Sequence, residues 1–204
     1  MHISRFHYLT QDLPNISHQD LAEIACKNGI KWLQLRVKNK SLDEYLFIAK
    51  EVKRITDKYK STLIINDNVE ICKEINADGV HLGKNDLAPL EARKILGSNK
   101  IIGATANTVI DILQHQNDVA NYIGLGPYKF TNTKKNLSPV LGVEAYTEIF
   151  KNNNFQIPIV AIGGIQLADM KILMNTGVYG IAVSSAINLS YQKEKTIADF
   201  LQLV

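Results

Sequence analysis

Residues 32–67, WLQLRVKNKSLDEYLFIAKEVKRITDKYKSTLIIND, contain a complete strand–helix–strand unit. Short apolar runs typical of strands lie at its two ends, in Trp32–Lys38 and Thr62–Asp67. Between them, Ser41-Leu-Asp-Glu44 has the form of a capping box, and apolar residues follow at helical spacing as far as Ile55. Because strands joined through a helix pair in parallel, this unit predicts a parallel sheet covered by helices.

The same alternation runs along the whole chain. We expect strands, with helices between them, at Phe6–Thr10, Trp32–Lys38, Thr62–Asp67, Gly79–Gly83, Ile101–Ala106, Tyr122–Tyr128, Pro158–Gly164 and Gly180–Ile187. One helix is predicted to begin at Ser17 and to end before Gly29, and another to begin at Asp169 and end before Gly177. Eight units favour an α/β fold with a single domain over residues 1–204, a closed (β/α)8 TIM barrel. Such barrels typically have about 250 residues, and the alternative is a doubly wound open sheet.

The composition excludes several classes of protein. Of the 204 residues, 46% are hydrophobic and 21% are charged, which is typical of a globular chain and not of a disordered one. The net charge of +3 is too small to indicate nucleic-acid binding, but it fits one or two anion sites. Cys26 and Cys72 are too few and too far apart for a disulfide scaffold or a zinc ribbon. Without an apolar run of about 18 residues or a secretory leader, we expect a cytoplasmic protein with no membrane partner.

Chemistry in such barrels sits at the carboxyl ends of the strands and in the loops that follow. On the second strand, Leu33 and Leu35 alternate with Gln34, Arg36 and Lys38. The polar set should face the barrel interior and its carboxyl end, because the apolar set must meet the helices. Two adjacent cations there need anions, from carboxylates or from a ligand. The alternative, a solvated edge strand, requires an open sheet.

Asp67 and Asp86 follow the third and fourth strands, and neighbouring strands lie about 4.8 Å apart. Two carboxylates about 5 Å apart repel by roughly 3 kcal/mol at an effective dielectric constant of about 20. A divalent cation would relieve this repulsion, and magnesium commonly takes one or two protein carboxylates together with substrate phosphates. We therefore expect a Mg²⁺ site here. The alternative is that the two aspartates cap the helices that begin near Asn68 and Ala88.

Smaller polar residues follow the fifth and sixth strands. Thr105 and Asn107 end the fifth strand, where a turn or a cap would explain them equally well. The long loop after the sixth strand carries Thr131, Thr133 and Lys134, which suit a phosphate, although a solvated surface loop would contain the same residue types.

The last two predicted strands contain Gly163-Gly164 and Ser184-Ser185 toward their carboxyl ends. Loops at these positions often bind phosphate through backbone N–H groups, although glycines also end strands for packing reasons. His81, inside the fourth strand, is more typical of a structural or ligand-contacting histidine than of a catalytic one. The sequence therefore predicts a highly charged anion region with a metal and a milder anion region, which suggests two phosphorylated substrates.

Taken together, these residues resemble the thiamine phosphate synthase family. The resemblance extends from Tyr8 to Ile187 and rests on motifs that are modestly specific alone but strong in this order and spacing. The motifs are Gln34-x-Arg36-x-Lys38, Ile65-Asn-Asp67, Ala77-Asp-Gly-Val-His-Leu-Gly83 with Asp86, Gly124-x-Gly-Pro127, Thr131-x-Thr-Lys134, Ala161-x-Gly-Gly-Ile165 and Ala182-Val-Ser-Ser-Ala-Ile187.

The resemblance implies a transferase that joins hydroxymethylpyrimidine diphosphate to hydroxyethylthiazole phosphate, giving thiamine phosphate and pyrophosphate. It implies that magnesium-assisted loss of pyrophosphate leaves a pyrimidine cation, which the thiazole nitrogen captures. It also implies residue roles. Asp67 and Asp86 would bind Mg²⁺. The diphosphate would be held by the catalytic residues Arg36, Lys38 and Lys134 together with Asn66, with Thr105 at its edge. Gln34 and His81 would lie near the pyrimidine, and the thiazole and its phosphate would be held by Thr131, Thr133, Gly164, Ser184 and Ser185.

The chain departs from the family pattern in places. Thr105 and Asn107 stand where the family usually has Ser and His, and Lys84-Asn85 stand where it usually has Gln-Glu. A related thiazole tautomerase is the nearest competing function, but Pro127 occupies the position of its catalytic histidine. Two more distant functions on the same fold are a non-catalytic barrel that binds phosphorylated ligands and a phosphate-binding isomerase or aldolase. The oligomeric state stays open, a homo-oligomer included.

Overall fold

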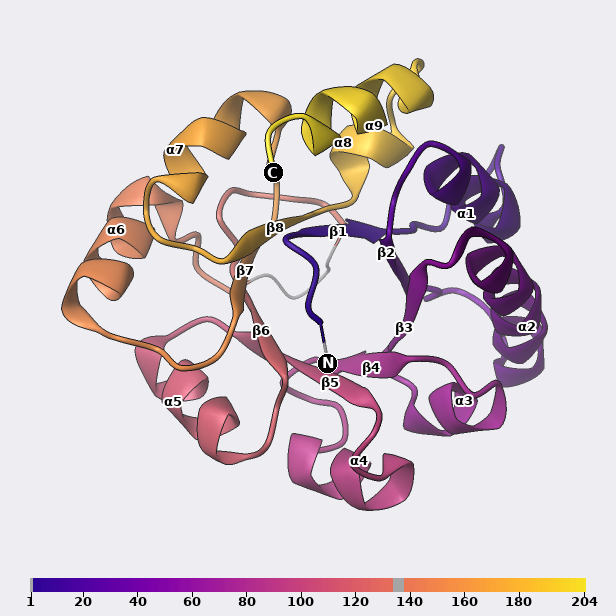
Figure 1. The fold of residues 1–204 in the computed structure, drawn as a ribbon, viewed down its shortest axis with the longest axis horizontal. Coiled ribbons are helices and arrows are strands. Elements are labelled where there is room, and N and C mark those ends of the chain that lie inside the picture. The colour runs from indigo at the N-terminus through magenta and orange to yellow at the C-terminus, as the bar shows by residue number, and fades with distance from the viewer. Residues whose placement is uncertain (1, 134–137) are drawn as a thin grey trace.

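The apolar runs pair side by side in chain order. In residues 2–133 and 138–204, which the computed structural model describes, eight parallel strands form one closed barrel, because β8 returns to pair with β1 (Figure 1). The strands are β1 Phe6–Leu9, β2 Trp32–Leu35, β3 Thr62–Asn66, β4 Gly79–Leu82, β5 Ile101–Ala106, β6 Tyr122–Leu125, β7 Ile159–Ile162 and β8 Gly180–Val183. The predicted (β/α)8 TIM barrel is thus confirmed, and the open sheet is wrong.

Helices surround the barrel, as Figure 1 shows. They are α1 His18–Lys27, α2 Leu42–Tyr59, α3 Val69–Glu74, α4 Pro89–Leu96, α5 Val109–Asn117, α6 Gly142–Asn152, α7 Met170–Met174, α8 Ser185–Asn188 and α9 Lys193–Leu201, with a 3-10 turn at Leu167–Asp169 before α7. The capping box predicted at Ser41 is present, and a second one forms at Ser17, where a helix start was predicted. The two hydroxyls accept from the N–H groups of Glu44 and Asp20. None of the described helices is long and apolar enough to cross a membrane.

Most strands end earlier than their apolar runs suggest. β2 ends at Leu35, not Lys38, because the N–H groups of Arg36 and Lys38 donate to side chains instead of to a neighbouring strand. β8 ends at Val183, not Ile187, because the chain turns at Ser184 into α8. Polar residues that the sequence analysis put in strands therefore lie in the loops just beyond them.

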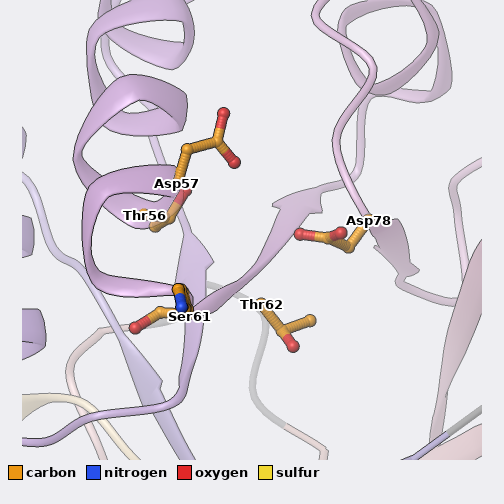
Figure 2. A pocket seen from close by; sticks show the side chains of 6 residues that line it. Thr56, Asp57, Ser61, Thr62 and Asp78 are labelled. Carbon is orange, nitrogen blue, oxygen red and sulfur yellow. The ribbon is translucent and has the colours of Figure 1, made fainter.

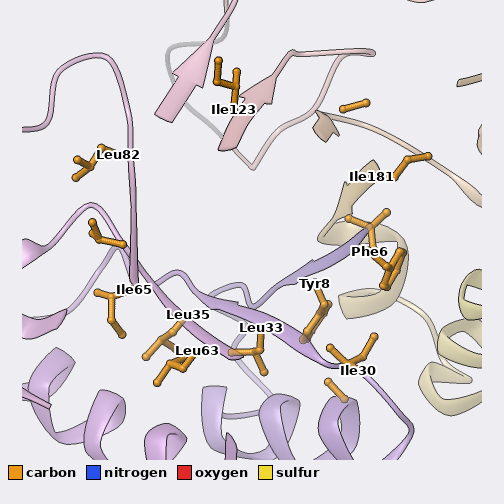
Figure 3. Packing of buried hydrophobic residues seen from close by; sticks show 14 of the residues in the cluster. Phe6, Tyr8, Ile30, Leu33, Leu35, Leu63, Ile65, Leu82, Ile123 and Ile181 are labelled. Atoms are coloured by element: carbon orange, nitrogen blue, oxygen red, sulfur yellow. The ribbon is translucent and has the colours of Figure 1, made fainter. Parts of the chain in front are cut away.

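The larger part of the core lies between the strands and the helices. Leu33, Leu35, Leu63 and Ile65 are fully buried there and point from β2 and β3 toward the helices (Figure 3). The alternation predicted for the second strand is therefore correct: its leucines meet the helix layer and Gln34 faces the other way, where it is 3% exposed. At about 25 cal/mol per Å² of buried apolar surface, this layer supplies most of the driving force for folding.

The barrel interior has an apolar, aromatic lower half. Trp32 and Tyr122 pack there edge to face, with ring centroids 5.5 Å apart, and His7 stacks on Trp32 at 4.3 Å. Ile3, from the segment before β1, closes the amino end of this cluster. Burial lowers the pKa of His7 to about 3, so its imidazole is neutral. Apart from His7, the interior polar residues discussed below lie toward the carboxyl end of the barrel, called the mouth.

Candidate active site

Polar side chains from β2 and β3 meet just below the mouth. Gln34 and Asn66 are both buried, and the Gln34 amide donates a 2.8 Å hydrogen bond to Asn66 Oδ1. The hydroxyl of Tyr45, at the start of α2, lies 3.0 Å from the main-chain oxygens of Leu35 and Asn66, where these two strands end. The strand ends are thereby held together, and two amide side chains face the interior.

Arg36 lies directly above Gln34 and is half-buried. Its guanidinium donates a 2.8 Å hydrogen bond to the main-chain oxygen of Thr133, in the loop between β6 and α6. Desolvation lowers the pKa of Arg36, although the charges of Asp67 and Asp12 act in the opposite direction. A cation held in this way is well suited to a multiply charged anion.

Asp67 connects the β3 tip to two other predicted site residues. Its carboxylate forms an ion pair with Lys38, and it also contacts the carboxyl of Asp86. The backbone of Asp67 has a left-handed φ of 65°, and its N–H donates to the oxygen of His81 at 2.8 Å. This turn directs Asp67 toward β4, so the two carboxyl groups predicted to meet do meet.

Asp86 is a perturbed acid. Burial raises its pKa to about 6, and the hydrogen bond and negative charge of Asp67 add to this effect. The N–H of Gly83 donates to Asp86 Oδ2 at 2.6 Å and holds the carboxyl in position. Two carboxyl groups that disfavour each other's ionisation are a suitable pair of oxygen donors for a divalent cation.

The capping interpretation of these aspartates is wrong. The N-cap of α3 is Asn68, whose side chain accepts from the N–H of Ile71 at 2.8 Å. The N-cap of α4 is Ala88, with no side-chain cap. Among the residues described, no cluster of three or more His, Cys, Asp or Glu side chains is arranged around a metal position. Two protein carboxylates fit magnesium better than zinc, since Mg²⁺ keeps water and substrate phosphate in its remaining positions.

His81 and Thr105 form a second polar group on β4 and β5. His81 Nε2 lies 3.1 Å from Thr105 Oγ1, and its Nδ1 lies 3.0 Å from the Tyr122 hydroxyl. Gly103 makes room for this arrangement, because a Cβ there would lie 2.2 Å from the Tyr122 ring. His81 is thus held on both sides, with Thr105 above it toward the mouth.

The loop between β6 and α6 contributes the two predicted threonines. The hydroxyls of Thr131 and Thr133 are 2.7 Å apart, and the N–H of Thr133 donates to Thr131 Oγ1 at 3.3 Å. Through the Thr133 oxygen the loop reaches Arg36 on the other side of the mouth. Lys134, the predicted catalytic cation of this loop, lies outside the described residues.

The predicted phosphate residues follow β7 and β8, which pair with Ile162 opposite Ala182. Gly164 has a left-handed φ of 67°, and a Cβ there would lie 2.7 Å from the oxygen of Phe130. Ser184 is the N-cap of α8, and its hydroxyl accepts from Asn188 at 3.0 Å; Ser185 is the first residue of that helix. In the closed strand order these residues lie across the mouth from Asp67 and Asp86.

The residues that depart from the family pattern have partners of their own. Lys84 forms a 2.7 Å ion pair with Asp111 on α5, so its charge is balanced away from Asp86. Asn107 donates to the Gly126 oxygen and accepts from Ser138 at 2.9 Å, which ties β5 to the loop after β6. These substitutions therefore leave the carboxylate pair intact.

Sequence reasoning missed the residues that follow β1. Thr10 and Asp12 accept hydrogen bonds from the N–H groups of Arg36 and Lys38, and His18 contacts both of them. Their position in the sequence could have indicated them, because Thr10 and Asp12 follow the first strand as Asp67 follows the third.

The opposite end of the barrel holds a different kind of hollow. It has a volume of about 330 Å³ and lies beside the amino end of β3, where Figure 2 shows Thr62 and Asp78 among the residues that line it. The carboxylate of Asp78 accepts from the N–H of Leu63 at 2.8 Å. Polar groups at this end of such barrels serve stability, so this hollow is separate from the site.

Comparison with known proteins bears on the identity of this site. A family model described as thiamine monophosphate synthase matches residues 9–187. The chain is 50% identical over 173 residues to a thiamine-phosphate synthase of Flavobacterium johnsoniae, covering 83% of this chain and 82% of that one. It is 53% identical over 169 residues to that of Flavobacterium psychrophilum, covering 81% and 82%. In structure it is similar to a thiamine phosphate pyrophosphorylase from Pyrococcus furiosus, with a TM-score of 0.86, 29% identity and coverage of 98% and 95%.

Proposed function

The chain belongs to the thiamine monophosphate synthase family, and on that basis we propose that it joins hydroxymethylpyrimidine diphosphate to hydroxyethylthiazole phosphate. The products are thiamine phosphate and pyrophosphate. The chain is therefore a transferase of thiamine biosynthesis with small-molecule substrates. We further propose that it acts in the cytoplasm, which agrees with its two free cysteines.

The diphosphate of the pyrimidine substrate binds at β2 and at the loop after β6. Arg36 and Lys38 contact its oxygens, together with Lys134, and Asn66 and Thr105 lie at its edge. The contact of Lys38 with Asp67 and the reach of Arg36 to Thr133 support this role, since both cations already lie beside polar groups at one side of the mouth. Gln34 and His81, lower in the interior, face the pyrimidine ring.

Asp67 and Asp86 hold Mg²⁺ in this proposal. Bound there with the diphosphate, the ion would neutralise negative charge on the departing pyrophosphate. Arg36, Lys38 and Lys134 stabilise the same charge as the carbon–oxygen bond breaks, so the step needs no strong base. The thiazole nitrogen then captures the pyrimidine methylene cation.

The thiazole phosphate binds on the opposite side of the mouth. Gly164 lets the backbone approach an anion closely, and Ser184 and Ser185 begin α8. Thr131 and Thr133 hold the thiazole side from above. Their 2.7 Å contact puts two hydroxyls at one edge of the mouth and supports this assignment.

One observation carries the proposal: Asp67 touches both Asp86 and Lys38. A metal donor pair and a diphosphate cation therefore share one position at adjacent strand tips. A thiazole tautomerase or a phosphate isomerase would have no use for this combination, and a barrel that only bound a ligand would not need the metal.

The direct test is product formation from the two phosphorylated precursors, with Mg²⁺ and with a chelator. We expect thiamine phosphate and pyrophosphate in equal amounts, only when Mg²⁺ is present. Product formation that is equally fast in chelator would refute the metal assignment. No product under either condition would refute the reaction, and an assay of thiazole isomerisation would then test the tautomerase.

A further inference from the structure

Three residues that follow β1 hold the segment that carries Arg36 and Lys38. The N–H of Arg36 donates to Thr10 Oγ1 at 3.0 Å, and the N–H of Lys38 donates to Asp12 Oδ2 at 3.0 Å. β2 has ended at Leu35, so these bonds replace strand pairing for this segment. His18, at the start of α1, connects the two acceptors.

The bonds through His18 have a defined direction. Asp12 Oδ1 lies 2.9 Å from His18 Nε2, and a carboxylate accepts, so Nε2 carries the proton. In the neutral ring Nδ1 is then an acceptor, and the hydroxyl of Thr10 donates to it at 2.9 Å. The same hydroxyl oxygen accepts from Arg36. Thr10 is fully buried and His18 is 6% exposed, so this part of the network is shielded from water.

We propose that Thr10, Asp12 and His18 form a positioning clasp for the diphosphate cations. The clasp fixes the position of the main chain of residues 36–38. It thereby determines which positions the side chains of Arg36 and Lys38 can occupy. Without it the segment after β2 has no strand partner to hold it, and both cations would sample positions away from the diphosphate. This inference rests on the proposed function, because it assumes that Arg36 and Lys38 contact that group.

The role of Asp12 in the clasp can be distinguished from a purely electrostatic effect of its charge. The charge of Asp12 also acts on Arg36, so its loss could weaken anion binding without moving the backbone. Asn at position 12 separates the two effects. Its amide oxygen accepts from the N–H of Lys38, and its NH₂ group donates to His18 Nε2 once the ring takes the other tautomer. Position is preserved and the charge is removed.

The test compares Asp12→Ala, Asp12→Asn and the control Asp20→Ala. Asp20 lies nearby on α1 and contributes to the capping box of that helix, so its loss also removes a stabilising carboxylate but breaks none of the bonds to residues 36–38. The readouts are the KM for each substrate and the Kd for inorganic pyrophosphate with Mg²⁺, measured by calorimetry. Thermal unfolding confirms that each variant is folded at the assay temperature.

We expect Asp12→Ala to raise the pyrimidine diphosphate KM and the pyrophosphate Kd about tenfold, with the thiazole phosphate KM changed less than twofold. Asp12→Asn should stay within about threefold of the unaltered chain, and Asp20→Ala should bind as the unaltered chain does. An equal rise in both KM values, or an Asp12→Asn defect as large as that of Asp12→Ala, would overturn the clasp. If the unaltered chain makes product and Asp12→Ala binds normally, only the clasp fails. If the unaltered chain neither makes product nor binds pyrophosphate, the proposed function fails and the clasp with it.

Discussion

Replacing Asp86 with Asn should stabilise the metal-free protein while abolishing its response to magnesium. Asp86 and Asp67 are in contact, and two unit charges at about 4 Å interact by roughly 4 kcal/mol at an effective dielectric constant of 20. Lys38 offsets part of this repulsion through its ion pair with Asp67. The repulsion that remains between the two carboxylates is what a bound divalent cation would relieve.

The magnitude follows from the pKa of Asp86. A rise from 3.8 to about 6 corresponds to about 3 kcal/mol between its two protonation states. Since the side chain is only half-buried, screening by solvent reduces this to about 1 kcal/mol. The folded state binds the proton more tightly than the unfolded chain, so ionisation costs stability as the pH rises through 4 to 6, and the full cost applies above pH 6. Asn removes that cost at pH 8.

The assay is urea unfolding at pH 8, with a chelator and with saturating Mg²⁺, beside steady-state turnover. In chelator Asp86→Asn should unfold with about 1 kcal/mol more free energy than the unaltered chain. Magnesium should stabilise the unaltered chain and not the variant, and kcat should fall at least a hundredfold. Asp43→Asn, which removes an exposed carboxylate from the first turn of α2, is the control and should leave kcat and the response to Mg²⁺ unchanged. A variant that is less stable in chelator, or that responds normally to Mg²⁺, would refute the reasoning.

Three further predictions concern the rest of the chain. Lys134→Ala should raise the KM for the diphosphate tenfold or more, as expected for a lost charged contact of about 1.5–3 kcal/mol. The KM for thiazole phosphate should stay within twofold. An equal rise in both KM values would mean that the loop is misassigned. Gly164→Ala should cost about 1–3 kcal/mol in urea unfolding and weaken thiazole phosphate binding, because its Cβ would lie 2.7 Å from the Phe130 oxygen. Gly142→Ala is the control, because Gly142 has the same φ of 67° and a Cβ there would meet only the end of the Glu144 side chain, at 3.2 Å. A loss as large as that of Gly164→Ala would contradict the close approach. His7 has a pKa of about 3 in the folded protein and is neutral there, whereas in the unfolded chain it takes a proton below pH 6.5. The free energy of unfolding should therefore fall as the pH is lowered from 6 to 4, by up to about 1.4 kcal/mol per pH unit. A His7→Gln variant should show a shallower dependence in urea titrations, and an unchanged slope would refute this account.

The sequence predicts the barrel because its signals are local and repeated. A run such as Leu63-Ile-Ile65, preceded by the capped amphipathic helix α2, has one way to bury its apolar surface, against neighbours of the same kind. The face of β2 that carries Gln34 is predictable for a similar reason, since side chains alternate along a strand. The contact between Asp67 and Asp86 can be predicted once β3 and β4 are known to be adjacent in the sheet, because their carboxyl ends then lie side by side.

The strand ends were less predictable. Arg36 and Lys38 continue the alternation of β2, yet the strand stops at Leu35 because side chains from the segment after β1 take over its hydrogen bonds. Such partners are distant in sequence, so no local sequence pattern predicts them. The same is true of Arg36 and the Thr133 oxygen, which are 97 residues apart.

By itself, then, the sequence determined the closed barrel and the residue types that face the mouth, because these depend on periodicity and on strand order. The tertiary structure alone decided which of those residues touch. It showed that Asp67 contacts both Asp86 and Lys38, that Asn68 and not Asp67 caps α3, and that Asp12 accepts from the N–H of Lys38. Contacts of this kind depend on the local backbone conformation, such as the left-handed conformation of Asp67. That conformation is determined by packing in the folded protein and not by a local sequence pattern.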